Sequence, residues 1–301
     1  MDTISNAVLG LLIGDALGVP YEFHPPEALP PPESIEMEPP AGFSRAHPSV
    51  LVGTWSDDGA QALCLLASLL HCGRLDVEDF GRRMVDWLDH GYCAVDGVVF
   101  DVGFTTSRAL SVIRGGAPAA TAGPTGERDN GNGALMRVLP LALWHRGDDR
   151  ALVDDAMAQS RVTHGHLRSQ LCCAVYCLWA RRVAAGHPAA WDDAKVALRR
   201  AVGDTPEVNE ELDGPVGLDR APGGGGTGYV VDCLHSARGA LEAGDFEAVA
   251  RAAVALGHDT DTTAAVACGI AGLTRPIPER WIHALRGREL VEPLLDGLRA
   301  R

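Results

Sequence analysis

Apolar residues recur along this chain at intervals of three and four positions, the spacing that places them on one face of an α-helix. In residues 3–18, for example, this spacing joins Ile4, Val8, Leu11 and Leu12. The same period predicts further helices over residues 58–72, 78–90, 105–115, 133–146, 150–159, 166–185, 190–202, 228–243, 245–256, 262–273 and 278–286. Clear alternating patterns, which are typical of β-strands, are absent from the sequence. We therefore predict an all-α fold.

Two segments lack this period and are predicted to be loops. Residues 24–50 contain HPPEALPPPESIEMEPP, which is too rich in proline for the interior of a helix. Residues 203–227 begin with GDTPEVNEELDG and end in a glycine-rich stretch. Either segment could link two domains, but we favour two surface loops on a single domain of residues 1–301. Loops of this length in a compact domain often act as lids over a functional site.

Charge and cysteine content narrow the classes of function. The formal net charge is −14 and no basic stripe is present, so we expect no direct binding to nucleic acid. The 8 cysteines form no C-x-x-C pair, and most lie in apolar helical segments, which predicts buried free thiols in a reducing cytoplasm. The N-terminus lacks a basic signal-peptide region, and we expect no run of about 18 apolar residues that would span a membrane.

A hydroxyl and two adjacent carboxylates, Ser56, Asp57 and Asp58, stand directly before the apolar run AQALCLLASLL. Helix capping is one explanation, because Ser and Asp are favoured at helix N-termini and anions there are stabilised by the helix dipole. A single carboxylate would serve that purpose. The second one needs a further partner, such as a basic group or a metal ion.

A second acidic cluster has the same order of residue types. Asp259, Asp261 and Thr262 lie in GHDTDTT, which also precedes an apolar helical segment. Capping remains an alternative for each cluster alone, but four carboxylates that converge would need cations to stay ionised together. Oxygen-only ligands favour Mg²⁺, Mn²⁺ or Ca²⁺ over Zn²⁺, and four carboxylates can neutralise two divalent ions. The adjacent His258 is more typical of a packing residue, or of one supporting the ligands, than of a ligand itself.

Several motifs in order resemble the ADP-ribosylglycohydrolases, the family typified by dinitrogenase-reductase-activating glycohydrolase. The resemblance covers most of the chain. The matching segments are GLLIGDALGVPYE (10–22), WSDDG (55–59), FDVGFTT (100–106), NGNGALMRVLPLAL (130–143), THGH (163–166), GTGYVVDCLHSA (226–237) and LGHDTDTTAAVACGIAGL (256–273). Each motif alone is weak, whereas the whole series in family order is specific.

This resemblance implies a single-domain, orthogonally packed bundle of helices with a binuclear Mg²⁺ or Mn²⁺ centre. The ligands carried over by position are Ser56, Asp57, Asp58, Asp259, Asp261 and Thr262. The chain departs from the family pattern at two places, where Ser56 stands for the usual Thr and Gly59 for a second Thr. Serine keeps the hydroxyl oxygen, so ligation by Ser56 is retained. Gly59 is expected to remove a side chain beside the site.

The resemblance also assigns residues that bind the substrate. Asn130, Gly131, Asn132 and Gly133 are expected to open a helix and to offer backbone N–H groups to a diphosphate. An ordinary turn and cap is the alternative for this segment.

Two further side chains complete the expected substrate site. His164 would hydrogen-bond to phosphate or ribose, and Tyr229 would stack on the substrate. Without the resemblance, His164 would be interpreted as a cap or core residue and Tyr229 as a core tyrosine.

Three carboxylates are expected to support the reaction. Glu22 would be a mobile metal ligand and gate, or a general base. Asp15 and Asp101 would anchor the groups around the metals, with Asp101 also a possible proton donor. Helix capping is the alternative for Asp15 and Asp101.

The function implied is a metal-dependent hydrolase that removes ADP-ribose from a modified protein side chain. It would cleave at the anomeric carbon of the distal ribose, with Asp58 or Glu22 as base, and a route through a ring-opened sugar is equally compatible. An arginine N-glycosidic linkage is favoured. The alternatives are a serine O-linkage, a small molecule containing ADP-ribose, or a non-catalytic ADP-ribose-binding or structural protein. We expect a cytoplasmic monomer that does not bind membranes.

Overall fold

The secondary structure of this computed structural model, which describes residues 2–300, is almost entirely helical. Fourteen α-helices occur within these residues: α1 (Thr3–Gly18), α2 (Asp57–Cys72), α3 (Val77–His90), α4 (Phe104–Arg114), α5 (Leu139–Trp144), α6 (Asp149–Arg161), α7 (Leu167–Ala184), α8 (Ala190–Val202), α9 (Pro206–Asp213), α10 (Val230–Ala240), α11 (Phe246–Val254), α12 (Thr260–Ala271), α13 (Glu279–Ala284) and α14 (Arg288–Arg299). No β-strand forms in the described part of the chain, where Gly131 and Tyr229 make an isolated antiparallel bridge. The all-α prediction is confirmed.

Short 3₁₀ turns are the other regular elements among residues 2–300. They span Val19–Tyr21, Pro26–Ala28, Pro32–Ser34, Val95–Gly97, Ala119–Thr121 and Leu241–Ala243. Two of them interrupt the proline-rich segment 24–50, which contains no α-helix, as predicted. The fixed φ of proline suits these turns but excludes the interior of a longer helix.

The structure differs from the predicted helix over 133–146. The helix in this segment, α5, begins only at Leu139, and the residues before it form successive turns. Leu135 N donates to Asn132 O, and Val138 N donates to Leu135 O, which are three-residue turn bonds rather than helical ones. The apolar spacing continues through this segment because its side chains are buried, and the period therefore overstated the length of the helix.

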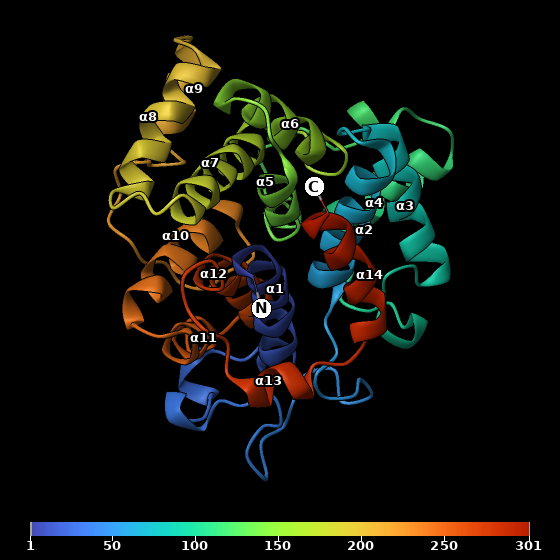
Figure 1. The fold of residues 1–301 in the computed structure, drawn as a ribbon, viewed down its shortest axis with the longest axis vertical. Coiled ribbons are helices and arrows are strands. Elements are labelled where there is room, and N and C mark those ends of the chain that lie inside the picture. The colour runs from blue at the N-terminus through green and yellow to red at the C-terminus, as the bar shows by residue number, and fades with distance from the viewer. Residues whose placement is uncertain (1, 301) are drawn as a thin grey trace.

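Two helices lie outside the predicted set. α9 occupies part of the predicted loop 203–227, with the Thr205 side chain capping it and Pro206 in its first turn. Only Leu212 of this helix is fully buried, so its apolar period is weak. α14 follows the last predicted helix and lies beside α2 (Figure 1), where a Cβ at Gly297 would come within 3.0 Å of Leu70.

Among the described residues, the most extensive contact between two helices joins α1 and α12, which lie side by side near the middle of the view in Figure 1. Gly10, Gly14 and Gly18 recur at every fourth position of α1 and share one face. A Cβ at these glycines would lie only 2.3–2.4 Å from backbone atoms of Cys268, Ala264 and Asp261, respectively. The absence of side chains on this face allows the two helices to approach backbone to backbone.

The first helix and the turn after it are long and apolar enough to meet the criterion for a membrane span, which we expected no segment to meet. Residues 3–21 (19 residues) are long and apolar enough, by length and composition alone, to cross a membrane. This corrects the expectation, although 83% of the apolar window is buried inside the protein. Core helices meet the same criterion, so this finding gives only weak support for a membrane span.

The start of α2 is held by a side chain from α1. Asp15 accepts hydrogen bonds from Ser56 N and Gly59 N, both at 2.8 Å. A Cβ at Gly59 would lie 2.7 Å from Leu12 Cδ2 and 2.8 Å from Trp55 Cγ. Gly59 therefore makes room for packing between α1 and α2, because the side chain that it lacks would collide with Leu12 and Trp55.

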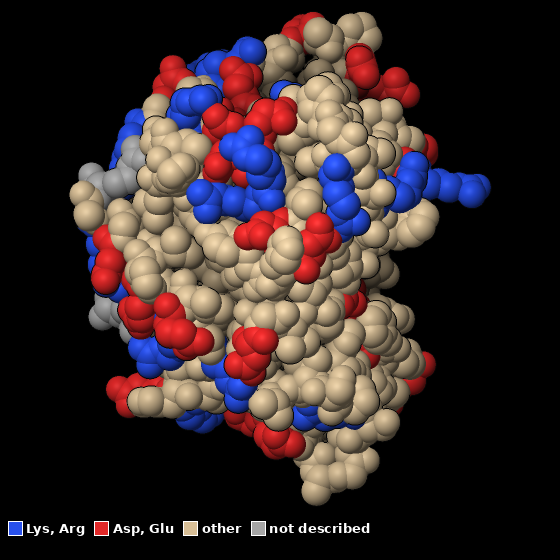
Figure 2. Space-filling model, turned by 90° about the vertical axis from the view of Figure 1, so that its right-hand side faces the viewer, with Lys and Arg blue, Asp and Glu red and all other residues tan. Residues whose placement is uncertain are grey.

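Charged and sulfur-containing side chains are distributed as the sequence indicated. On the face shown in Figure 2, basic and acidic side chains are interspersed and no continuous basic band is visible. All eight cysteines are unpaired; seven are buried and Cys72 is partly buried. The prediction of free thiols is confirmed.

The α1–α12 contact generates a stability prediction. Replacing Gly14→Ala should lower the free energy of unfolding by about 1–3 kcal/mol, because the added methyl group would overlap the α12 backbone. This loss should exceed the gain of roughly 1 kcal/mol in helix propensity. Gly225→Ala is the control, since a Cβ there meets its nearest atoms at 3.8 Å. Thermal denaturation measures both variants, and a Gly14→Ala protein as stable as the wild type would contradict the close packing.

Candidate metal centre and active site

A cavity of about 260 Å³ opens where the starts of α2, α4 and α12 meet the connecting loops. Its lining includes five carboxylates, Glu22, Asp57, Asp58, Asp101 and Asp259. None of the described residues that line it is Lys or Arg. The cavity therefore concentrates negative charge without a cation of its own.

The two acidic clusters predicted from the sequence meet at this cavity. Thr262 Oγ1, at the start of α12, donates to Asp58 Oδ1, at the start of α2, over 3.3 Å, although the two residues are 204 positions apart. Asp57, Asp58, Asp259 and Thr262 line the cavity. The hypothesis that the two helix starts converge is confirmed.

Buried carboxylate oxygens without hydrogen-bond partners mark this convergence. Asp58 Oδ2 and Asp261 Oδ2 are both buried and unpartnered. Oxygens of Glu22, Asp259 and Asp261 lie within 4.8 Å of one another, a separation that allows one ion to contact all three. An unpaired buried charge is costly, and oxygen-only donors suit a hard divalent cation. The residues present therefore fit a metal centre.

Burial and mutual repulsion perturb the acidity of this group. Burial, followed by the charges of neighbouring carboxylates, raises the pKa of Asp57, Asp58 and Asp261 well above the usual range. The same two causes raise the pKa of Glu22 to about 10 and that of Asp101 to about 6. A divalent cation would favour the ionised forms and oppose these shifts.

Helix capping accounts for only part of the acidic pattern. Ser56 caps α2, since its Oγ accepts from Asp58 N at 3.3 Å, and Asp15 supplies a second cap. Burial raises the pKa of Asp15 to about 7. Asp259 precedes α12 but makes no side-chain cap there; its Oδ2 accepts from Asn132 Nδ2 at 2.9 Å. The carboxylates of Asp57 and Asp58 are therefore not needed as caps of α2, and each has one oxygen bonded to another side chain, Gln61 or Thr262.

Glu22 is held by a residue that the sequence analysis missed. His47 Nε2 lies 2.8 Å from Glu22 Oε2, and ligand atoms of Glu22, His47 and Asp101 lie within 4.8 Å of one another. Burial lowers the pKa of His47, which favours its neutral form. No sequence signal singles out His47, because it lies in the long loop 24–50 and meets Glu22 only in the folded chain.

The backbone around Glu22 is strained. Phe23, His47, Asp101 and His258 all have φ between 48° and 64°, a region that non-glycine residues rarely occupy. His258 O accepts from Phe23 N at 2.7 Å, and His258 N donates to His24 O at 2.7 Å. His258 thus fixes the loop after Glu22 through its backbone. Strain of this kind often clusters at functional sites.

The NGNG segment lines the cavity in a different way from the one predicted. It does not open a helix, because turns separate it from α5. The prediction that this segment forms a helix N-terminus that binds the diphosphate is therefore wrong. Gly131, Asn132 and Gly133 line the cavity directly. Asn130 instead supports the loop, with Oδ1 accepting from Ser169 Oγ at 2.9 Å.

His164 lines the cavity, and its ring packs against the glycines of this loop. Its Nδ1 contacts Thr163 Oγ1 at 2.9 Å, and a Cβ at Gly133 would lie 2.9 Å from its ring. Burial, with a further contribution from the positive charge of Arg137, lowers the pKa of His164 to about 3. A neutral imidazole therefore faces the cavity at physiological pH.

Two aromatic residues border the site. Tyr229 is 38% exposed and is therefore not a core tyrosine; it follows Gly228, which lines the cavity, but is not itself among the lining residues. Phe104 lines the cavity and is 76% exposed. Phe104 was not expected at the site from the sequence, although it is an aromatic residue beside a glycine at a predicted helix start.

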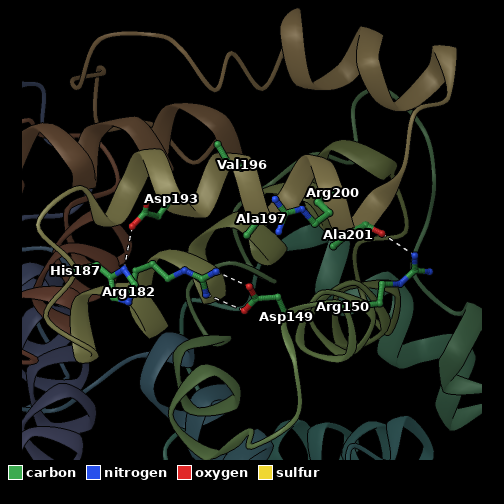
Figure 3. A pocket seen from close by; sticks show the side chains of 9 residues that line it. All are labelled: Asp149, Arg150, Arg182, His187, Asp193, Val196, Ala197, Arg200 and Ala201. Atoms are coloured by element: carbon green, nitrogen blue, oxygen red, sulfur yellow. Dashed lines mark hydrogen bonds and ion pairs between the residues drawn. The ribbon is translucent and has the colours of Figure 1, made fainter.

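A second cavity, of about 520 Å³, lies among α6, α7 and α8 (Figure 3). Its acidic side chains already have basic partners, since Asp149 is paired with Arg182 and Asp193 with His187. Arg150 donates to the backbone oxygen of Ala201 at 2.7 Å. Its lining therefore offers none of the unpartnered carboxylate oxygens that distinguish the first cavity.

Comparison with known proteins identifies the family. The family model described as ADP-ribosylglycohydrolase matches residues 1–301. The chain is 30% identical to "ADP-ribosylarginine hydrolase Tri1" of Serratia proteamaculans, over 99% of this chain and 79% of that protein. It is also 30% identical to "ADP-ribosyl-[dinitrogen reductase] glycohydrolase" of Rhodospirillum rubrum, over 94% and 90%.

A solved structure supports the same assignment. It is described as an "ADP-ribosylglycohydrolase-related protein complex", and it superposes with a TM-score of 0.76 at 33% identity, covering 99% of this chain and 96% of that one. With the matching fold, the converging acidic clusters and the full-length family match, the chain belongs to the ADP-ribosylglycohydrolase family and is an enzyme of the glycosidase class.

Proposed function

We propose that this protein is a metal-dependent hydrolase that removes ADP-ribose from an arginine side chain of a modified protein. The bond cleaved joins the side chain to the anomeric carbon of the distal ribose. The observation that carries this proposal is the pair of buried, unpartnered oxygens, Asp58 Oδ2 and Asp261 Oδ2, at two converging helix starts. The same proposal includes a cytoplasmic monomer, in keeping with the unpaired thiols.

Two divalent cations, Mg²⁺ or Mn²⁺, would be held at this convergence. The ligands would be the carboxylates and hydroxyls of the two clusters, namely Ser56, Asp57, Asp58, Asp259, Asp261 and Thr262, with Glu22 held beside them by His47. When bound, such cations orient the vicinal hydroxyls of the ribose and polarise the reacting centre. They would also balance the charge of a diphosphate substrate in a cavity that lacks basic lining residues.

The remaining lining residues would hold the ADP-ribose. Gly131, Gly133 and Gly228 line the cavity with their backbone, and their missing side chains leave room for His164 and Asp259. Neutral His164 can exchange hydrogen bonds with ribose or phosphate oxygens. Phe104, exposed on the cavity wall, offers an aromatic face for stacking, and the half-exposed Tyr229, next to the lining residue Gly228, is a second candidate.

Proton transfer is assigned to the carboxylates on the cavity wall. A water molecule attacks the anomeric carbon, and Glu22, oriented by His47, takes its proton; Asp58 is the alternative base. Asp101, with its pKa raised to about 6, lies beside Glu22 and can donate a proton to the leaving nitrogen. In a route through a ring-opened sugar, the same Asp101 would protonate the ring oxygen.

The arginine linkage is supported by chemistry and by similarity. The relatives from Serratia proteamaculans and Pseudomonas putida are both named as ADP-ribosylarginine hydrolases. The described lining residues include five carboxylates and neither Lys nor Arg, so the field in the cavity favours a guanidinium group. A serine linkage offers no positive charge for these groups to bind.

Removal of metal should change the pH dependence of stability. In the metal-free protein, the raised pKa values of Asp15 (about 7) and Asp101 (about 6) mean that the folded state holds protons that the unfolded state releases near pH 4. Stability should therefore fall as pH rises from about 4 through about 7, and Glu22, with its pKa raised to about 10, should extend the fall to higher pH. Saturating Mn²⁺ should reduce this fall, and at about 100 Kd it should add about 2.7 kcal/mol per site, or roughly 5–10 °C in Tm. Melting curves with EDTA and with Mn²⁺ at pH 5 and pH 8 measure both effects; identical curves would contradict the metal centre.

Substitution of one carboxylate from each cluster should abolish hydrolysis. Asp58→Asn and Asp261→Asn each replace a charged ligand with a neutral one, so the rate should fall by at least about 10³-fold, and the double variant should be little worse. ADP-ribose should still bind, more weakly, through the 131–133 loop. Single-turnover hydrolysis and calorimetry measure these effects, with exposed Asp296→Asn as the control. Near-wild-type hydrolysis by either single variant would show that the clusters do not form one active site.

Linkage preference is tested on matched peptides. With Mg²⁺ or Mn²⁺ present, kcat/KM should be at least about ten-fold higher for an ADP-ribosyl-arginine peptide than for the ADP-ribosyl-serine peptide, because about 1.4 kcal/mol from the charged contact suffices for this ratio. Faster release from serine would reverse the assignment of the linkage. Tight ADP-ribose binding without turnover of either peptide would indicate a non-catalytic binding protein.

A further inference from the structure

A fully buried cation, Arg137, lies beneath the acidic cavity and has no role in the reaction proposed above. Arg137 is 0% exposed and follows the 131–136 segment that borders the cavity. Its guanidinium donates to Gln61 Oε1 at 2.9 Å, to Gln159 Oε1 at 3.1 Å and to Gln159 O at 3.1 Å. It also lies 5.1 Å from the centre of the Phe80 ring. The three hydrogen-bond acceptors are all neutral.

The chemistry of Arg137 determines how Gln61 is oriented. A guanidinium can only donate hydrogen bonds, so the amide oxygen of Gln61 must face it. The amide nitrogen of Gln61 then faces the other way, and it donates to Asp57 Oδ2 at 2.8 Å. One carboxylate oxygen of Asp57 is thereby fixed, which leaves Oδ1 as the oxygen available to a cation at the cavity.

A second arm of the same network reaches the substrate loop. Gln159 on α6 accepts from Arg137 through its side-chain oxygen, and its Nε2 donates to Ala134 O at 3.2 Å. Ala134 directly follows Gly133, which lines the cavity. The guanidinium thus connects the metal-binding end of α2 to the loop that would hold ADP-ribose.

The burial of this charge is costly, and no carboxylate among residues 2–300 forms a hydrogen bond or ion pair with it that would offset the cost. Burial lowers the pKa of Arg137 to about 10, so the guanidinium remains charged at neutral pH. The charge of Asp57 nearby favours this charged form. Through the neutral amide of Gln61, the buried guanidinium can orient the Asp57 carboxylate and leave its second oxygen free. An arginine paired directly with Asp57 could occupy both oxygens.

We propose that Arg137 and Gln61 are positioning residues of the metal centre, and that Arg137 sets Asp57 through Gln61 and the 131–136 loop through Gln159. This inference rests on the proposed ligation of metal by Asp57. It predicts that metal affinity and ADP-ribose affinity depend on separate arms of one network. Groups that orient metal ligands typically change metal affinity by 10–100-fold when they are replaced.

The metal arm is tested by calorimetric titration of Mn²⁺ into the metal-free protein. Gln61→Met should weaken Mn²⁺ binding by about 10–100-fold, because Asp57 loses its donor. Gln61→Glu exchanges the amide nitrogen for oxygen, so it should weaken binding at least as much. This direction is diagnostic, since a charge effect alone would predict tighter Mn²⁺ binding from an added carboxylate.

The substrate arm is tested in the same preparations. Gln159→Met should weaken ADP-ribose binding by several-fold and leave the Mn²⁺ dissociation constant within two-fold of the wild type. Arg137→Met should weaken both. Arg238→Met is the matched control, because Arg238 is also buried but contacts His235, Arg220 O and the Trp191 ring, none of which lines the acidic cavity. It should change Tm without changing either affinity.

Circular dichroism and Tm establish that each variant is folded. If Arg137→Met does not fold, the two Gln61 variants decide the question. Folded Gln61 variants that bind Mn²⁺ within two-fold of the wild type, or tighter binding by Gln61→Glu, would overturn the positioning role while leaving the metal centre intact. If the wild-type protein binds no Mn²⁺, the metal centre itself is wrong, and the positioning role falls with it.

Discussion

The backbone contact between α1 and α12 is the constraint on which the site depends. Because Gly10, Gly14 and Gly18 carry no side chains, α12 lies against α1, and the Cα of Asp261 comes next to Gly18. The same α1 presents Asp15 to the first N–H groups of α2. One helix therefore positions the starts of the two others, and the two acidic clusters meet because both starts are fixed to α1.

This convergence creates an electrostatic problem that the fold answers in several ways. Buried carboxylates repel each other and lose hydration, which explains the raised pKa values throughout the cluster. Hydrogen bonds from Asn132, Thr262 and Gln61 satisfy some oxygens, whereas others stay unpartnered. A site arranged in this way is less stable alone than with cations bound. The same cations would let a protein of net charge −14 bind an anionic substrate.

Strain around Glu22 fits this picture of a preorganised site. Four non-glycine residues in the left-handed region lie in the three loops that meet at Glu22, and backbone hydrogen bonds join two of these loops. Such conformations persist only where the surrounding structure holds them. The proline-rich segment contributes His47 to this arrangement, so a loop without α-helix still has a defined contact with the cavity.

The sequence by itself determined the helical class, most helix positions, both acidic clusters and the family, because these depend on local periodicity and on motifs that lie within short segments. It did not show α9, whose apolar period is weak, or the turns before Leu139, whose buried side chains imitate a helix. Only the tertiary structure decided which residues pack against Gly59 and what His47, Gln61 and Arg137 contact. Each depends on contacts between residues far apart in the chain, such as Gln61 and Arg137, which are 76 positions apart, and no local pattern records such contacts.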